Sequence, residues 1–78
     1  MTTLNEIKPG NGAIIVSVNG SGALRRRLLD MGLTPKTKVF VNKVAPMGDP
    51  MELSLRGYVL TLRGDDAKNI DVIVEDAS

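Results

Sequence analysis

Cysteine and histidine are both absent from this chain of 78 residues. Without them the chain lacks the common nucleophiles, proton shuttles and soft metal ligands, so binding is favoured over catalysis. A chain without cysteine has no disulfides, the usual covalent support of secreted domains of this size, and this favours a reducing compartment. We therefore expect a non-enzymatic, cytoplasmic binding protein with no metal centre and no cofactor.

Aromatic residues are nearly absent as well, because the chain has only Phe40 and Tyr58. Two rings are too few to line a proline-peptide groove or to stack the bases of single-stranded nucleic acid. The longest apolar run, residues 13–16, is far shorter than the roughly 20 residues that span a bilayer. The first residues also lack the basic start and the apolar stretch of a signal peptide. We therefore expect no nucleic-acid binding, no export and no insertion into a membrane.

Charged residues are present but unevenly distributed. The net charge is +1, yet residues 24–63 carry eight Lys and Arg against three acids, whereas residues 65–78 carry one Lys against five acids. A modest basic region of this kind suits an acidic protein surface and raises the rate of association with it. It falls short of the strongly basic footprint of a nucleic-acid-binding domain.

The length allows one small domain, residues 1–78, with an aliphatic core. Alternation of apolar and polar residues is typical of half-buried strands. It predicts short strands at 13–18, 52–56, 58–63 and 70–74. Segment 38–44 alternates imperfectly but is rich in Val and Phe, so it is expected to be a fifth strand, second in chain order. Gly57 permits a tight reversal, so the third and fourth strands are expected to form a hairpin. Residues 64–69 have room for about one helical turn.

A helix of about three turns is expected between the first two strands. Ser21 is a suitable N-cap, and Gly32 suits the left-handed position just after a helix. Leu24, Leu28 and Met31 recur at helical spacing and are expected to pack against the core. Strands with no long crossover helix between them should pair antiparallel and largely close on themselves, since closure removes exposed edges. The fold class is therefore mainly β, a small SH3-like antiparallel barrel of about five strands with one inserted α-helix.

The segment from Pro46 to Pro50 is expected to be a rigid loop that presents side chains. Each proline fixes its own φ at about −65° and withholds an amide donor. Asp49 is expected to cap a turn of its own loop. Met47 has two interpretations: an exposed, flexible side chain for an adaptable protein interface, or a lid over one end of the barrel.

Three segments, taken in their order and spacing, resemble the FeoA family of ferrous iron transport proteins over nearly the whole chain. They are Arg27-Leu28 with Met31-Gly32-Leu33-Thr34-Pro35, then Pro46-Met47-Gly48-Asp49-Pro50, then Arg56-Gly57-Tyr58-Val59-Leu60-Thr61-Leu62-Arg63. The family commonly has Pro-Gly where this chain has Pro35-Lys36, and lysine tolerates a positive φ poorly. The same domain is similar to the SH3-like C-terminal module of iron-dependent repressors.

The resemblance implies a small cytosolic accessory protein of bacterial ferrous iron uptake. Its partner would be FeoB, a membrane permease with a cytosolic GTPase domain. Binding would recruit the chain to the inner face of the membrane and modulate the GTPase or the gating of the permease. The similarity to repressors implies an alternative, a regulatory domain related to their C-terminal module. Because the chain lacks His and Cys, we expect the partner to handle the transported iron.

The positions expected to contact the partner are Arg25, Arg26, Met47, Asp49, Pro50 and Arg56. The arginine cluster 25–27 has two interpretations, a contact for an acidic partner surface or a solvated helix face on which Arg26 and Asp30 pair. A bolder hypothesis is that one of these arginines stabilises transition-state charge on the γ-phosphate of the partner's nucleotide. The acidic residues show no calcium-loop spacing or other metal-ligand pattern.

Overall fold

The structure is a computed structural model that describes residues 2–75. Its strands are β1 (Gly12–Val18), β2 (Lys38–Val44), β3 (Met51–Leu55), β4 (Tyr58–Leu62) and β5 (Ile70–Glu75). Its α-helices are α1 (Gly22–Asp30) and the one-turn α2 (Gly64–Ala67), and its 3-10 turns are η1 (Leu4–Glu6) and η2 (Pro46–Gly48). Every predicted strand is confirmed, with bounds that agree to within one residue at each end.

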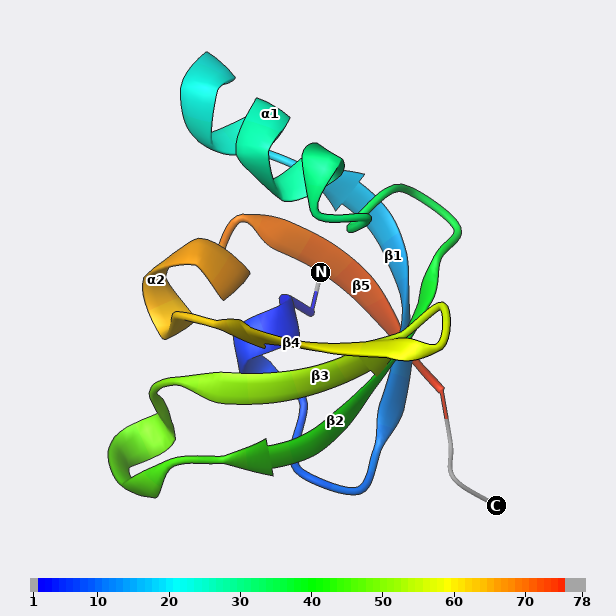
Figure 1. Ribbon diagram of the computed structural model, residues 1–78, viewed down its shortest axis with the longest axis vertical. Helices are drawn as coiled ribbons and strands as arrows, with labels where there is room; N and C mark the ends of the chain where they lie inside the picture. Colours follow the sequence, from blue (N-terminus) through cyan, green and yellow to red (C-terminus); the bar gives the residue numbers. More distant parts are fainter. Residues whose placement is uncertain (1, 76–78) are drawn as a thin grey trace.

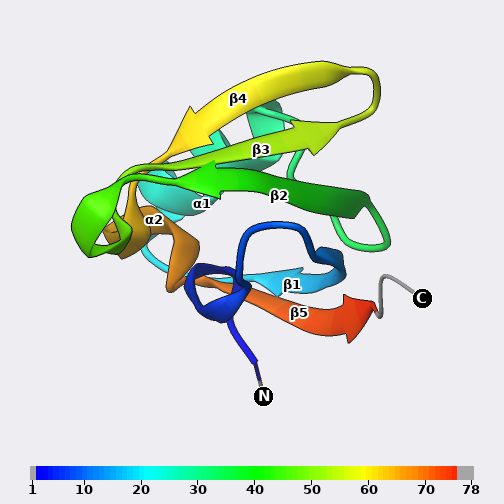
Figure 2. The same cartoon turned by 90° about the horizontal axis from the view of Figure 1, so that it is seen from below.

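All the strand pairings are antiparallel, and the order in the sheet is β4-β3-β2-β1-β5. The sheet curves strongly around the core, so that β2, β3 and β4 lie on one side and β1 and β5 on the other (Figures 1 and 2). Within this order β1 pairs with β2 along one edge and with β5 along the other. The predicted mainly β fold with one inserted helix is confirmed.

The sheet does not close into a complete barrel. Its outer strands, β4 and β5, are not hydrogen-bonded to each other. α2 lies in the connection between them, and its Ala67 is buried in the core (Figure 1). The expectation of a largely closed sheet is therefore wrong, because a helical turn separates the two strands where a ladder would have to begin.

The core is aliphatic, as the scarcity of aromatic residues requires. Phe40 and Tyr58 lie at its margin, with 41% and 42% of their surface exposed. Leu28 of α1 is fully buried, so the helix packs on the sheet through the predicted apolar stripe. Leu4 and Ile7 are also buried, although no periodic pattern in the sequence indicates it. The first turn of the chain is thus part of the folded core.

α1 begins and ends where its sequence indicates. Ser21 Oγ accepts a hydrogen bond from the backbone N–H of Leu24 at 3.3 Å. Gly32 follows the helix with a φ of 95°, and the N–H of Leu33 donates back to the carbonyl of Leu28 at 3.2 Å. This arrangement is a Schellman motif, which satisfies carbonyl groups that the last helical turn leaves unpaired.

The β3–β4 hairpin differs from expectation by one residue. Leu55 pairs with Tyr58, so the turn contains only Arg56 and Gly57, with φ of 50° and 86°. Positive φ at both central residues is typical of the type I′ turn, whose twist matches that of the flanking strands. The prediction that Arg56 ends the third strand is therefore wrong, because a two-residue turn needs the residue before Gly57 as well.

Lys36, between α1 and β2, also has a positive φ, of 74°. Its N–H donates to the carbonyl of Ile15 at 2.7 Å, and the N–H of Thr37 donates to the carbonyl of Thr34 at 3.1 Å. Backbone bonds on both sides therefore hold the turn in the left-handed conformation that a glycine would adopt more readily.

Candidate partner-binding surfaces

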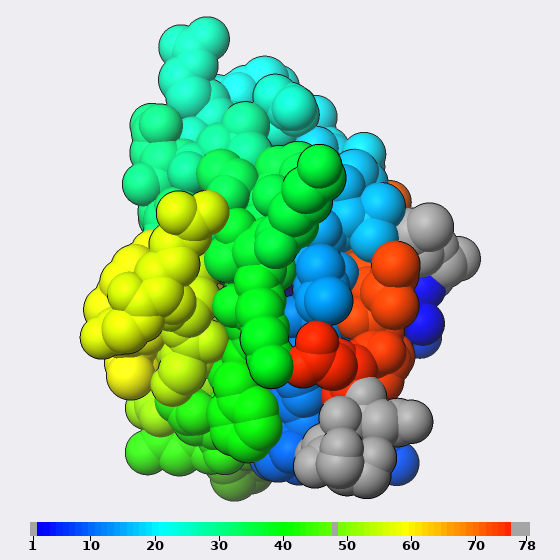
Figure 3. Space-filling view, turned by 90° about the vertical axis from the view of Figure 1, so that its right-hand side faces the viewer, coloured from blue at the N-terminus to red at the C-terminus, as the bar shows by residue number. Residues whose placement is uncertain are grey.

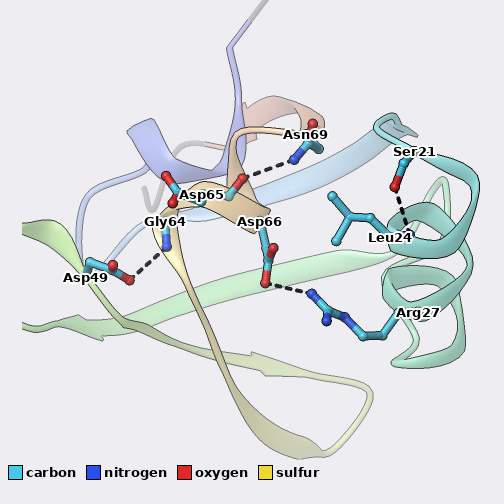
Figure 4. Close-up of polar contacts among 8 residues, drawn as sticks. All are labelled: Ser21, Leu24, Arg27, Asp49, Gly64, Asp65, Asp66 and Asn69. Atoms are coloured by element: carbon cyan, nitrogen blue, oxygen red, sulfur yellow. Dashed lines mark hydrogen bonds and ion pairs between the residues drawn. The ribbon is translucent and has the colours of Figure 1, made fainter.

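The arginine cluster of α1 is not a uniform charged face. Arg25 Nε donates to the carbonyl of Val18 at 3.0 Å, at the end of β1. Arg27 forms an ion pair with Asp66 of α2, with 3.1 Å between Nη2 and Oδ2 (Figure 4). Arg26 is exposed and has no hydrogen bond or ion pair within residues 2–75. Two of these arginines are therefore bonded to other parts of the fold, and Arg26 is available to a partner.

The expected ion pair between Arg26 and Asp30 does not occur among the ion pairs of residues 2–75. An i,i+4 pair with the cation on the N-terminal side has the weaker orientation and contributes at most about 0.5 kcal/mol. Both side chains are exposed, so hydration and side-chain entropy outweigh so small an attraction. The guanidinium of Arg26 is consequently not committed to its own helix.

Met47 is at the tip of the loop between β2 and β3, and its side chain is fully exposed, at 101%. The interpretation of Met47 as a lid over the barrel is therefore wrong, since a lid would be partly buried. The expected exposure of Met47 is confirmed, and its role in a protein interface stays a prediction. Its φ is 74°, in the left-handed region that disfavours residues with a side chain. Pro46 before it starts the η2 turn, and the base of the loop is closed by the N–H of Ala45, which donates to the carbonyl of Pro50 at 2.9 Å.

Asp49 has a partner outside its own loop. Its Oδ1 accepts a hydrogen bond from the N–H of Gly64, the first residue of α2, at 2.9 Å (Figure 4). The prediction that Asp49 caps a turn of its own loop is therefore wrong, because the first turn of α2 offers an unpaired donor and a favourable dipole end. α2 is thus bound to the loop through Gly64 and to α1 through Asp66.

A shallow pocket of about 390 Å³ lies beside the base of the loop. Its wall is largely apolar and includes Val44, Pro46, Pro50 and Met51, with Thr61 of β4 at one side. Another hollow, of about 320 Å³, is lined by polar residues such as Asp49 and Lys68 together with Met47 of the loop. Residues of the loop therefore line two concave regions, one largely apolar and one polar.

Arg56 braces the connection between α1 and β2. Its Nη2 donates to the hydroxyls of Thr34 and Thr37, each at 2.8 Å, and Thr37 is only 6% exposed. Next to it, the hydroxyl of Tyr58 donates to the carbonyl of Met31 at the end of α1. Arg56 is among the positions expected to contact a partner, but its contacts within the chain are those of a brace.

The expected contact positions fall in three separate places. α1, which carries Arg25 and Arg26, and the loop with Met47, Asp49 and Pro50 lie at opposite ends of the long axis (Figure 1). The β3–β4 turn with Arg56 lies beside the loop that follows α1 (Figure 3). These positions therefore form two candidate surfaces, the α1 face and the 46–50 loop, and Arg56 supports the first of them.

Residues 2–75 hold no group of three or more acidic, His or Cys side chains that could bind a metal ion. In the same residues no helix is long and apolar enough to cross a membrane. The buried side-chain nitrogen and oxygen atoms in the described part of the chain all have a hydrogen-bond partner.

Comparison with known proteins gives a family. The FeoA domain profile matches residues 2–74. The chain is 38% identical over 69 residues to a Fe(2+) transport protein A/Fe(2+) transporter FeoB fusion protein of Porphyromonas gingivalis, a match that covers 88% of this chain but 8% of the fusion protein. It is 34% identical over 70 residues to a Campylobacter jejuni protein named as a Fe(2+) transport protein A, over 90% of this chain and 95% of that protein.

Solved structures agree with the family. The FeoA protein of Chlorobium tepidum superimposes with a TM-score of 0.87 at 39% identity, over 99% of this chain and 73% of that one. A Stenotrophomonas maltophilia FeoA, solved with zinc and described as a procaryotic SH3 domain protein, gives a TM-score of 0.82 at 26% identity, over 94% of this chain and 91% of that one. The SH3-like architecture is confirmed.

The likeness to repressors is one of fold alone. A manganese-dependent transcriptional repressor superimposes with a TM-score of 0.85, but at 12% identity, over 94% of this chain and 40% of that one. The family profile, in contrast, covers almost every residue that the structure describes. The chain therefore belongs to the FeoA domain family.

Proposed function

We propose that this protein is a cytosolic accessory protein of ferrous iron transport, which binds the cytosolic part of a FeoB permease and biases its GTPase or gating equilibrium. The observation that carries the proposal is the Porphyromonas gingivalis relative, in which an Fe(2+) transport protein A and an FeoB transporter are named as one fused protein. Fusion of two domains keeps each at an effective concentration of up to about 1 mM around the other. That arrangement is useful when the domains act together.

Regulation of a permease by a small binding protein requires different affinities for two states of the permease. A ligand that binds both states equally shifts neither, however tightly it binds. Nucleotide binding and hydrolysis give a GTPase two such states. The protein then acts by preferring one of them, and it needs no catalytic group of its own.

The α1 face is the better candidate for the contact. Arg26 is exposed and uncommitted, whereas Arg27 on one side of it has an ion pair with Asp66 and Arg25 on the other has a hydrogen bond to Val18. A rigid, basic helix face suits an acidic surface, because little side-chain and backbone freedom is lost on binding. The 46–50 loop, with the exposed Met47, supplies a second, apolar contact.

Co-purification with the full-length permease in detergent tests the proposal. The two proteins are mixed with a non-hydrolysable GTP analogue, with GDP, or without nucleotide, and the bound protein is measured. We expect retention that differs at least about 5-fold between nucleotide states. Equal retention in all states would reduce the role to that of a scaffold, and no retention by a folded, active permease would refute the proposal.

A charge reversal locates the contact. Arg26→Glu is expected to weaken retention about 10-fold or more, because it places a carboxylate against an acidic surface. The matched control is Lys8→Glu, which makes the same charge change at an exposed residue outside α1 and the 46–50 loop. If both variants lose binding equally, net charge rather than the α1 face explains the effect.

An arginine supplied directly to the nucleotide is a stronger version of the same proposal. It predicts that Arg26→Ala lowers stimulated GTP turnover by about 1000-fold, as loss of an arginine finger does. Turnover that falls only in proportion to lost binding would remove this version and leave the docking role intact.

A further inference from the structure

The side chains of this protein that oxidants attack most readily are its methionines. The chain has four Met and no Cys, His or Trp, so the thiols, imidazoles and indole rings that compete for oxidants in other proteins are missing. The three methionines that the structure describes differ sharply in access. Met47 is 101% exposed, Met31 is half-buried against the core, and Met51 is only 1% exposed. An oxidant in solution therefore reaches the sulfur of Met47 directly, whereas Met51 becomes accessible only when the chain opens.

The backbone holds Met47 at the tip of its loop. Its φ of 74° is one that glycine adopts more readily, and the N–H of Ala45 closes the loop on the carbonyl of Pro50 at 2.9 Å. A side chain kept at a strained position points to a role that glycine would not fill. The Met47 side chain borders the polar hollow lined by Asp49 and Lys68 and is no part of the core. Its sulfur can therefore gain an oxygen atom without any change in core packing.

We propose that Met47 is a reversible oxidation site, at which hypochlorous acid converts the thioether to the sulfoxide and thereby weakens binding of the chain to the permease. In the net reaction the sulfur loses two electrons and gains an S–O bond, the O–Cl bond breaks, chlorine leaves as chloride, and the proton passes to water. Hypochlorous acid is the oxidant because it attacks thioethers faster than it attacks amines or phenols. Methionine sulfoxide reductases reverse the step with two thiols, which become a disulfide while the oxygen leaves as water.

The effect on binding follows from the change in polarity. The thioether is apolar, polarizable and flexible, whereas the sulfoxide is polar and its oxygen accepts hydrogen bonds. Burial of that oxygen against an apolar partner surface without a donor is unfavourable, and the thioether has no such cost. This inference rests on the proposed function, in which Met47 is the apolar contact of the 46–50 loop. Because α1 contains no methionine, oxidation at Met47 leaves the α1 face unchanged.

Oxidation of the isolated, folded chain tests the site. The chain is treated with about one equivalent of hypochlorous acid, and mass spectrometry of its peptides locates the added oxygen atoms. We expect Met47 to be oxidised at least about 10-fold faster than Met31 or Met51, and the midpoint of urea denaturation to stay the same. Treatment in concentrated urea is the control, because all three should then react at similar rates. Equal rates in the folded chain, or a lower midpoint after oxidation of Met47 alone, would overturn the proposal.

Retention by the permease tests the consequence, with two variants that cannot be oxidised at this position. The oxidised parent chain should be retained about 10-fold less than the reduced chain, and the reductases with dithiothreitol should restore its retention. Met47→Leu keeps an apolar side chain and should be retained equally before and after treatment. Met47→Gln has a polar side chain and should be retained as weakly as the oxidised parent, with or without treatment. Both variants keep the other three methionines, so a loss of retention by treated Met47→Leu would assign the effect elsewhere and overturn the proposal.

Failure of this proposal and failure of the proposed function give different results. A reduced chain that the permease does not retain in any nucleotide state refutes the proposed function, and the effect of oxidation on binding is refuted with it. Reduced and oxidised chains that are retained equally leave the proposed function standing and refute the control of binding by Met47. Retention that the reductases do not restore refutes the reversibility of the step.

Discussion

Arg56 and Met47 have the same unfavourable backbone geometry and opposite surroundings. Their φ are 50° and 74°, a conformation that is unfavourable by about 1–2 kcal/mol for a residue with a side chain. Arg56 compensates within the chain, through bonds to Thr34 and Thr37. The Met47 side chain is fully exposed and makes no such bond. The difference suggests two reasons for tolerating strain: Arg56 supports the fold, and we infer that Met47 serves a contact with another molecule.

Gly32→Ala is expected to cause the largest loss of stability in the region that Arg56 supports. Gly32 has a φ of 95°, and a Cβ there would lie 2.2 Å from the hydroxyl oxygen of Tyr58. The substitution adds left-handed strain and displaces the bond from Tyr58 to Met31, so we expect a loss of about 3 kcal/mol in the free energy of unfolding. Urea denaturation measures it. Gly10→Ala is the matched control, with a φ of 89° and no atom within 4 Å of its Cβ, and it should lose only about 1 kcal/mol.

Arg56→Ala removes the brace itself and should lower the free energy of unfolding by about 1–2 kcal/mol, since hydrogen bonds from a charged group are lost at a nearly buried threonine. Thermal unfolding would show this as a fall of several degrees in Tm, roughly 4–8 °C per kcal/mol for a domain of this size. Met47→Ala, which truncates a fully exposed side chain, should change stability by less than about 0.5 kcal/mol. Equal losses for both variants would contradict the comparison.

Met47→Gly distinguishes the effect of backbone strain at Met47 from the effect of its side chain on binding to the permease. Glycine adopts the positive φ freely but adds freedom to the unfolded chain, so we expect a net gain of about 0.5–1 kcal/mol in stability. If the side chain serves a partner, the same variant should bind the permease less tightly, by about 10-fold. Denaturation and nucleotide-dependent co-purification measure the two effects. A variant that is more stable and binds normally would show that Met47 contacts no partner there.

Lys36→Gly is expected to have the smallest effect, a gain of about 0.5 kcal/mol. Lys36 has the same φ as Met47, 74°, but its N–H is bonded to the carbonyl of Ile15. Glycine therefore relieves the backbone strain without removing this hydrogen bond. The gain in stability is offset only by the greater conformational freedom of glycine in the unfolded chain. Denaturation checks the sign, and a loss of stability would mean that the lysine side chain supports the turn.

The elements could be predicted because their signals are local. Ser21 and Gly32 mark the two ends of α1, alternation marks four of the strands, and Val and Phe content marks β2. The turn at Arg56 was misplaced because a type I′ turn most often has Asn or Asp before glycine, and arginine gives no such signal. The Arg56 side chain is bonded to Thr34 and Thr37, which are distant from it in the sequence, and these bonds support the turn conformation.

The candidate surfaces were predictable as residue types but not as an arrangement. Exposure of Met47 follows from its place in a loop between prolines. The bonds of Asp49 to Gly64, of Arg27 to Asp66 and of Arg25 to the end of β1 join segments that only the folded chain brings together. For that reason Arg25 and Arg26 look equivalent in the sequence, although one is committed to the fold and the other is free.

The position of β1 in the sheet has a consequence for protein synthesis. β1 lies between β2 and β5, so one of its two neighbours is the last strand of the fold to leave the ribosome. Gly12 must pair with Glu75, and Val18 with Ile70, before that side of β1 is hydrogen-bonded. The β3–β4 hairpin, closed by two residues, forms in about 1–10 µs once made, but it cannot complete the core. A nascent chain that has not released β5 therefore exposes an apolar strand to chaperones and to other nascent chains.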